Sequence, residues 1–151
     1  MTASYKPKIE AFLQLKNIAV LGYSTQVGQP ANAIYKKLKD NGYHVFAVNP
    51  KANEVKDVAC YPDLKSIGEP IEGVILCTPA NATEQAVRDC AALGIANVWI
   101  HEGIGPGSYN EQAFQTARKL GLNVIPGACP MMYVKPDIFH WCFRHFKALP
   151  E

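Results

Sequence analysis

The sequence has little charge of either sign and no long apolar run. Of its 151 residues 19% are charged, and 15 Lys and Arg against 13 Asp and Glu leave a net charge of +2. No polybasic arm is present, which argues against a nucleic-acid binder that relies on bulk electrostatics. No apolar stretch approaches the roughly 20 residues of a membrane span, and residues 1–16 lack the apolar segment of a signal peptide. These absences predict a soluble, cytoplasmic protein.

The sequence also lacks the cysteine and histidine spacing of a disulfide framework or a metal site. Its five cysteines are an odd number without a C-x-x-C pair, which favours reduced thiols. The four histidines are scattered, and His140 and His145 are five apart, so they would not share a helix face. We therefore expect no bound metal.

Length and composition predict a single domain over residues 1–151. With 48% apolar residues, a chain of this length can bury roughly 68–70% of its unfolded surface in one core. No low-complexity linker or internal repeat divides the chain. The domain needs no disulfide or metal for its stability.

Short β-branched runs alternate with helical patterns along the chain. The patterns predict helices at 33–39, near 62–67, at 81–93 with Asn81 as cap, from the capping box Ser108-x-x-Glu111 to about 120, and from Pro136. They predict strands at 17–22, 43–48, 73–77, 97–101 and 122–125. This alternation predicts an α/β fold, a Rossmann-like doubly wound parallel five-stranded sheet with the order 3-2-1-4-5.

A ligand of such a sheet lies beyond the carboxyl ends of the strands, at the switch point between strands 1 and 4. The first loop there runs into a helix, and its backbone N–H groups could cradle a phosphate. It is neither G-x-G-x-x-G nor a P-loop, and a turn that simply needs small residues is the alternative. The candidate residues in this loop are Gly22, Tyr23, Ser24, Thr25, Gln29 and Pro30.

The end of the second strand carries Asn49 and then Lys51, where an NAD site would have an acidic residue for the ribose diol. A lysine suits a phosphorylated ribose, although a solvated loop lysine is the alternative. After the third strand, Thr78, Pro79 and Ala80 could pack against adenine or a pantetheine arm. They could equally do no more than end the strand and begin a helix.

The sequence offers no convincing catalytic set. His101 and Glu102 resemble an acid–base pair, but neighbours on a strand point to opposite faces. Neither Ser24 nor Ser108 has the partners of a hydrolase triad. Cys129 lies at the expected ligand edge, where a lowered pKa would make it a reactive thiolate. The alternative is an inert, half-buried thiol.

These loops together resemble the CoA-binding domain, which forms the amino-terminal part of the succinyl-CoA synthetase α subunit and also occurs as small stand-alone proteins. The resemblance covers roughly residues 16–132. It is carried by Gly22-Tyr-Ser-Thr, Val48-Asn-Pro-Lys51, Thr78-Pro79, Glu102-Gly103-Ile104 and Gly127-Ala-Cys-Pro130.

The resemblance implies that residues 22–25 wrap the CoA phosphates and that Lys51 meets the phosphorylated adenosine end. It also implies that residues 78–80 line the path of the nucleotide and the pantetheine. Many stand-alone members read Gly-Arg-Pro where this chain has Gly28-Gln29-Pro30, which removes a cation. The resemblance does not extend to the synthetase domain with the phosphorylated histidine, and His101 does not match that histidine, so the resemblance does not imply ligase activity.

We therefore expect non-catalytic binding of coenzyme A or an acyl-CoA, in a carrier, sensor or regulatory role. The alternative is an NADP-dependent oxidoreductase in which Lys51 reads the 2′-phosphate. A third hypothesis is a mixed disulfide between Cys129 and CoA.

The last helix carries more aromatic side chains than one core-facing stripe can bury. Burial of one face against a second subunit predicts a homodimer. Packing of this helix over the sheet edge within the monomer is the alternative. The side chains in question are Phe139, Trp141, Phe143 and Phe146.

Overall fold

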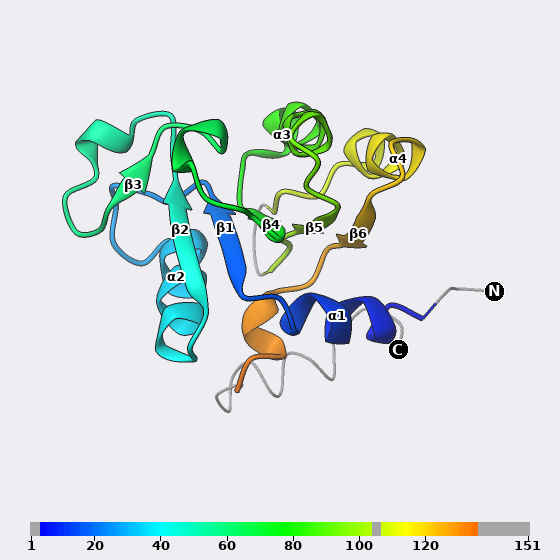
Figure 1. The fold of residues 1–151 in the computed structure, drawn as a ribbon, viewed down its shortest axis with the longest axis horizontal. Helices are drawn as coiled ribbons and strands as arrows, with labels where there is room; N and C mark the ends of the chain where they lie inside the picture. The colour runs from blue at the N-terminus through cyan, green and yellow to red at the C-terminus, as the bar shows by residue number, and fades with distance from the viewer. Residues whose placement is uncertain (1–3, 104–106, 136–151) are drawn as a thin grey trace.

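The computed structural model describes residues 4–103 and 107–135, which form a parallel β-sheet between two layers of helices (Figure 1). The helices are α1 (Lys6–Leu13), α2 (Pro30–Asp40), α3 (Ala80–Ala92) and α4 (Glu111–Lys119), with short 3-10 helices η1 (Ala52–Glu54), η2 (Lys65–Ile67) and η3 (Pro130–Met132). The strands are β1 (Asn17–Leu21), β2 (His44–Val48), β3 (Cys60–Tyr61), β4 (Gly73–Leu76), β5 (Asn97–Ile100) and β6 (Asn123–Pro126).

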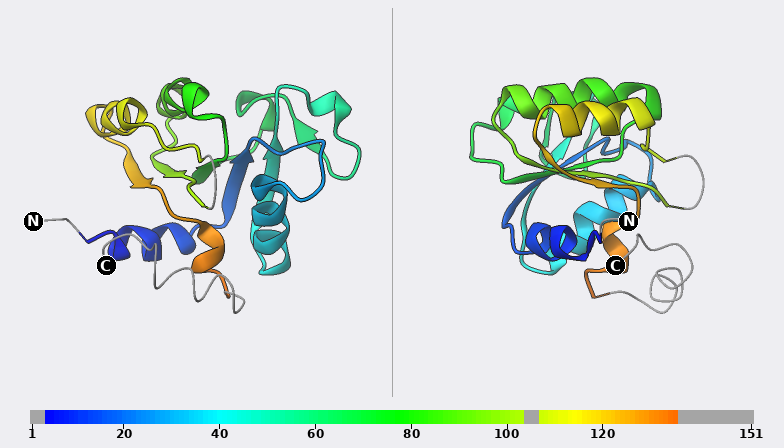
Figure 2. Two further views of the ribbon diagram at one scale, coloured as in Figure 1. Left: turned by 180° about the vertical axis from the view of Figure 1, so that it is seen from behind. Right: turned by 90° about the vertical axis from the view of Figure 1, so that its right-hand side faces the viewer.

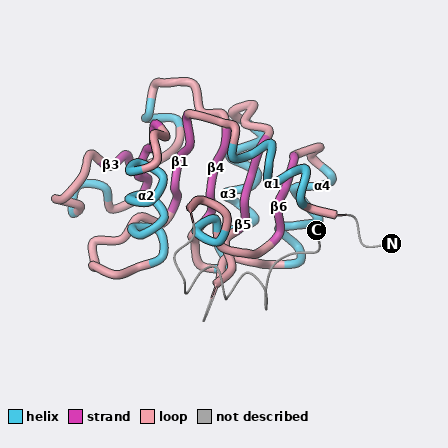
Figure 3. The backbone as a smooth tube through the Cα atoms, turned by 90° about the horizontal axis from the view of Figure 1, so that it is seen from below, coloured by secondary structure: helices cyan, strands magenta, loops and turns pink. Residues whose placement is uncertain are grey.

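The strands run in the order β3-β2-β1-β4-β5-β6, and every neighbouring pair is parallel. Seen from below, β1 and β4 lie side by side in the middle of the sheet (Figure 3). The predicted Rossmann-like parallel sheet is confirmed, and the order 3-2-1-4-5 continues into a sixth strand. One assignment was wrong: Cys60–Tyr61 takes the third place, and the strand predicted at 73–77 is the fourth, paired with β1. A two-residue edge strand is too short to show a hydrophobic period, which is why it was missed.

Both faces of the sheet are covered, with α1 and α2 on one side and α3 and α4 on the other (Figure 2). Side chains alternate between these layers along each strand. On β4, for example, Val74 and Leu76 pack in the core under α3 and α4, while Ile75 packs with Ile18 in the opposite core. Burial on both faces explains why the strands read as unbroken apolar runs.

The first helix, α1, was not predicted, because a strip of only two buried residues, Ile9 and Phe12, gives a weak helical pattern. Phe12 packs edge-on against Trp99, with ring centroids 5.4 Å apart. Trp99 is fully buried, and its Nε1–H donates to the carbonyl of Gly127 at 3.0 Å. This helix therefore closes the core beneath β4, β5 and β6.

Two predicted helix caps were wrong. No side chain caps α3, whose N-cap residue is Pro79 rather than Asn81. For α4 the cap is Asn110, whose side-chain oxygen accepts from the N–H of Ala113 at 3.1 Å, and not Ser108. Ser108 is instead buried, and its carbonyl takes part in a tertiary hydrogen bond. Sequence spacing alone does not distinguish a cap from a loop residue two positions earlier.

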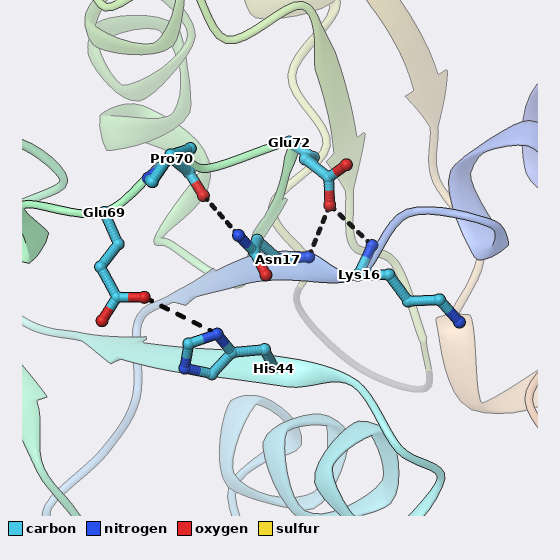
Figure 4. A network of polar contacts seen from close by, with 6 residues as sticks. All are labelled: Lys16, Asn17, His44, Glu69, Pro70 and Glu72. Carbon is cyan, nitrogen blue, oxygen red and sulfur yellow. Dashed lines mark hydrogen bonds and ion pairs between the residues drawn. The ribbon is translucent and has the colours of Figure 1, made fainter.

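A polar network joins the amino-terminal ends of the strands, at the edge opposite the expected site (Figure 4). The Glu72 carboxylate accepts from the N–H groups of Lys16 at 2.8 Å and Asn17 at 2.7 Å. The Asn17 amide donates to the carbonyl of Pro70 at 2.9 Å. The two backbone hydrogen bonds, first that from Asn17, hold the pKa of Glu72 below its ordinary value.

We expect Glu72→Gln to be less stable than the wild type at neutral pH and to lose this difference in acid. Because the folded-state pKa is lowered, the stabilisation is present above the ordinary carboxyl pKa of about 4.3 and is lost as the pH falls through the folded value. Urea unfolding midpoints at pH 7 and pH 3 measure the effect. Glu10→Gln, on the exposed side of α1, controls for the loss of charge, and a pH-independent deficit in the Glu72 variant would contradict the prediction.

Within the described part of the chain, no helix is both long and apolar enough to cross a membrane. The helix predicted from Pro136 lies outside the described residues. The homodimer through its aromatic face therefore stays a prediction.

Candidate functional site

A cleft of about 1000 Å³ lies at the carboxyl ends of β1, β2, β4 and β5. It includes the switch point, which is between β1 and β4, so the loop after Cys77 directly adjoins the loop after Leu21. Most of the predicted binding residues line it, namely Gly22, Ser24, Gln29, Pro30, Asn49, Thr78, Pro79 and Ala80. The predicted residues Tyr23, Thr25, Lys51 and Cys129 do not.

Gly22 is required where β1 meets the cleft. Its φ is +93°, and a Cβ there would lie 2.3 Å from the carbonyl oxygen of Cys77. Any side chain would force apart the backbones that follow β1 and β4. The floor of the cleft at the switch point is therefore bare backbone.

The first loop is held in shape by Asn32, from the first turn of α2. The Asn32 side-chain oxygen accepts from the N–H of Ser24 at 2.8 Å, and its amide donates to the carbonyls of Ser24 at 3.0 Å and Gln26 at 3.3 Å. The N–H groups of Thr25, residues 27–29 and Ala31 make no hydrogen bond to the described residues. The loop thus offers several unused donors beside the start of a helix, which suits an anion.

Asn49 joins the loops after β1 and β2. Its amide donates to the carbonyl of Tyr23, and its side-chain oxygen accepts from the N–H of Lys51 at 2.7 Å. Both ends of this side chain are thus engaged within the protein, so its role is to position the two loops. Tyr23 lies beneath them, buried, with its hydroxyl donating to Asp57 at 2.7 Å. Burial and that hydrogen bond raise the pKa of Tyr23.

The cation predicted to meet the ligand, Lys51, is exposed and lies outside the cleft wall, whereas Lys65 of η2 is part of the wall. The predicted short helix near 62–67 is confirmed as η2, but its place in the site was missed. Asp63, beside it, accepts from the N–H and hydroxyl of Ser66, both at 2.7 Å, which lowers the pKa of Asp63. Residues 62–65 form this arm of the cleft. The sequence patterns did not predict that they line it, because their place depends on the position of β3 in the sheet.

The outer wall of the same arm is one face of α3. Gln85 and Asp89 line it and are joined by a hydrogen bond of 2.9 Å, and Leu93 continues the wall with 45% of its surface exposed. Their four-residue spacing was a visible helical signal, but the pattern alone does not say that this side of α3 borders a cleft.

A chain of hydroxyls ties the loop after β4 to the loop after β5. Thr83 is fully buried in α3, and its hydroxyl donates to the carbonyl of Ser108 at 2.7 Å. Since that proton is used, the hydroxyl of Thr78, 3.0 Å away, is the donor to Thr83. Thr78 and Ser108 both line the cleft, so this chain sets the distance between two of its walls.

His101 lines the cleft just after β5, whereas Glu102 is exposed and is not part of the wall. Burial lowers the pKa of His101 to about 4, so its imidazole is neutral at physiological pH. The two residues therefore do not form a charged acid–base pair.

Cys129 follows β6 but does not line the cleft. Left-handed conformations at Gly127 and Ala128, with φ of +78° and +63°, precede it, and its side chain packs in the core with Trp99 and Met132. Burial raises the pKa of Cys129 to about 11, the opposite of what a reactive thiolate requires. This environment argues against the mixed-disulfide hypothesis.

No group of histidine, cysteine and acidic side chains in the described residues could hold a metal ion. Among the described residues, the cleft wall carries two carboxylates, Asp63 and Asp89, and one ammonium group, Lys65. These side-chain charges therefore do not favour an anion in the cleft, and the backbone N–H groups of the first loop are the donors that could bind one.

Comparison with known proteins gives a consistent result. The CoA binding domain family matches residues 16–135. ADP-forming acetate–CoA ligase II of Archaeoglobus fulgidus is 29% identical over 127 residues, which are 79% of this chain and 19% of the ligase, so the chain spans about a fifth of that relative. The uncharacterized protein YneT of Bacillus subtilis is 28% identical over 82% of this chain and 90% of its own. The structure of a hypothetical protein from Pyrococcus horikoshii superposes with a TM-score of 0.75 at 31% identity, over 85% of this chain and 88% of that one.

Proposed function

This chain belongs to the CoA-binding domain family, and from that premise we propose that it binds coenzyme A or an acyl-CoA in the cleft without a catalytic step. A carrier, sensor or regulatory role follows from such binding. The observation that carries the proposal is the first loop, which Asn32 holds in shape and in which several backbone N–H groups make no hydrogen bond to the described residues. The diphosphate of CoA is the group that these donors fit.

The order of the strands supports one direction for the ligand. The diphosphate would lie at the switch point, over Gly22 and the starts of α2 and α3. The adenosine end would lie toward β2 and β3, between Pro50 and residues 62–65. The pantetheine chain would then leave along β4 and β5, past Thr78 and His101.

The cleft wall at the end of β2 also disfavours NAD. Asn49 stands where an NAD site has an acidic residue for the ribose diol, and its side chain is already engaged. Two lysines are available for a ribose phosphate, Lys65 in the wall and Lys51 outside it. We propose that the 3′-phosphate of CoA is recognised at this end.

Thermal unfolding with CoA, dephospho-CoA, NAD and NADP tests the proposal. We expect CoA at 100 times its Kd to add about 2.7 kcal/mol of stability, which raises the Tm by roughly 5–10 °C. Dephospho-CoA should give a smaller shift. An NADP shift without a CoA shift would overturn the proposal in favour of the NADP-dependent alternative, and no shift with CoA would also overturn it.

Lys51→Ala and Lys65→Ala, compared with each ligand, identify the residue that reads the phosphate. Replacing the lysine that contacts the 3′-phosphate should lower the affinity for CoA about tenfold and leave the affinity for dephospho-CoA unchanged. Lys56→Ala, outside the cleft wall, controls for the loss of one positive charge. Equal losses for both ligands would show that the lysine acts only through the general field of the protein.

A further inference from the structure

The imidazole of His101 lines the cleft and makes no hydrogen bond to the described residues. The residue is 6% exposed, and its backbone N–H and carbonyl are bonded to Leu76 and Ser108 at 3.0 and 2.8 Å. No hydrogen bond or ion pair to its ring nitrogens is present in residues 4–103 and 107–135. No side-chain nitrogen or oxygen in the described residues is both fully buried and without a partner, so the unbonded ring nitrogens of His101 are open to the cleft, where a ligand group can reach them.

The chemistry of this ring limits what the ligand group can be. Burial lowers the pKa of His101 to about 4, so the ring offers one N–H donor and one acceptor at neutral pH. A phosphate would favour the charged imidazolium, which this environment disfavours. A neutral group with its own donor or acceptor, such as an amide, matches the ring better.

The position of His101 limits which part of the ligand reaches it. It follows β5, which lies beyond β4 from the switch point, while the loops after β2 and β3 lie on the other side of β1. A nucleoside over β2 and β3 with its phosphates at the switch point cannot also extend over β5. Whatever contacts His101 is the part of the ligand beyond the diphosphate.

We propose that His101 is a specificity-determining residue whose imidazole hydrogen-bonds an amide of the pantetheine chain. This inference rests on the proposed function and adds to it the means by which the protein distinguishes CoA from a nucleotide that lacks this chain. The neighbouring walls are compatible with such a chain, because Thr78 and Pro79 on one side and Gly107 on the other carry no charge.

The test compares His101→Leu and His101→Gln by calorimetry, with CoA and with adenosine 3′,5′-bisphosphate, which has the nucleotide end but no pantetheine. We expect His101→Leu to weaken CoA binding about five- to tenfold and to leave the bisphosphate unchanged. His101→Gln keeps a donor and an acceptor and should recover much of the CoA affinity. Equal weakening of both ligands, or none, would overturn the inference.

Two further readouts separate this role from a structural one. The ring makes no hydrogen bond to the described residues, so its replacement breaks none, and His101→Leu should unfold at the same temperature as the wild type or higher. In the wild type, the imidazole nitrogen NMR signals should shift with CoA and not with the bisphosphate. Binding of both ligands with equal affinity by the wild type would overturn the role of His101 alone, whereas failure to bind either would overturn the proposed function as well.

Discussion

Gly22→Ala should destabilise the protein by about 2–5 kcal/mol, the sum of a left-handed backbone that alanine disfavours and an overlap with backbone atoms. The added Cβ would lie 2.3 Å from the carbonyl oxygen and 2.8 Å from the carbonyl carbon of Cys77. A flexible side chain could move away, but this carbonyl follows a central strand. A loss of this size is a large part of the 5–15 kcal/mol that stabilises a typical domain. Urea unfolding measures it.

Gly28→Ala is the matched control for this variant. Gly28 lies in the same loop with φ of +85°, but nothing lies within 4 Å of the position of its Cβ. Its replacement should therefore cost only the conformational part, about 1–2 kcal/mol. The difference in unfolding free energy between the two variants isolates the close approach of Gly22, which follows β1, to the backbone of Cys77, which follows β4. Equal losses would show that this contact has no energetic consequence.

Thr83→Val should cost about 2–3 kcal/mol, although valine has nearly the same shape. The substitution removes the donor to the Ser108 carbonyl and the acceptor for the Thr78 hydroxyl. A buried group left without its hydrogen-bond partner costs about 1–3 kcal/mol. Because Thr78 and Ser108 line the cleft, the affinity for CoA should also fall.

Thr116→Val provides the comparison for Thr83. Thr116 lies on α4 and is nearly as buried, but its hydroxyl donates at 3.0 Å to the Glu84 carboxylate, which also accepts from Arg88. Because that carboxylate keeps a partner, this variant should lose less than about 1 kcal/mol, and its CoA affinity should be unchanged. Urea unfolding and calorimetry on both variants decide the matter. A Thr83 variant that resembled the Thr116 variant in both would contradict a linking role for the hydroxyl chain.

Sequence patterns did not predict which of several candidate side chains line the cleft, because tertiary contacts decide it. Cys129 follows a strand in the sequence, as a ligand-edge residue would, but two left-handed residues turn it into the core. Lys51 lies in the motif that carries the family resemblance, but Lys65 is the lysine in the cleft wall. The reason is that β3 pairs with β2, so residues 62–65, which follow β3, line the cleft together with the ends of β1 and β2. Neither outcome has a signature within a window of a few residues.

The role of His101 and of Thr83 likewise depends on residues distant in the sequence. Thr83 is paired with Ser108, 25 positions away. His101 was visible as a histidine after a strand, but its burial and the absence of a hydrogen bond from its ring to the described residues are properties of the packed molecule. A sequence indicates which residues are able to form hydrogen bonds, whereas the fold decides which of them remain unpaired.

The sequence by itself determined the parallel α/β architecture, the edge of the sheet where the cleft lies and the loop at the centre of that edge. Those features depend on local patterns: apolar runs buried on both faces, helical periodicity, and a glycine that ends the first strand. Tertiary structure alone decided which strand adjoins β1 at the switch point, which lysine enters the wall, and which thiol is buried. These depend on contacts between segments far apart in the chain, whose free energies exist only once the layers have packed.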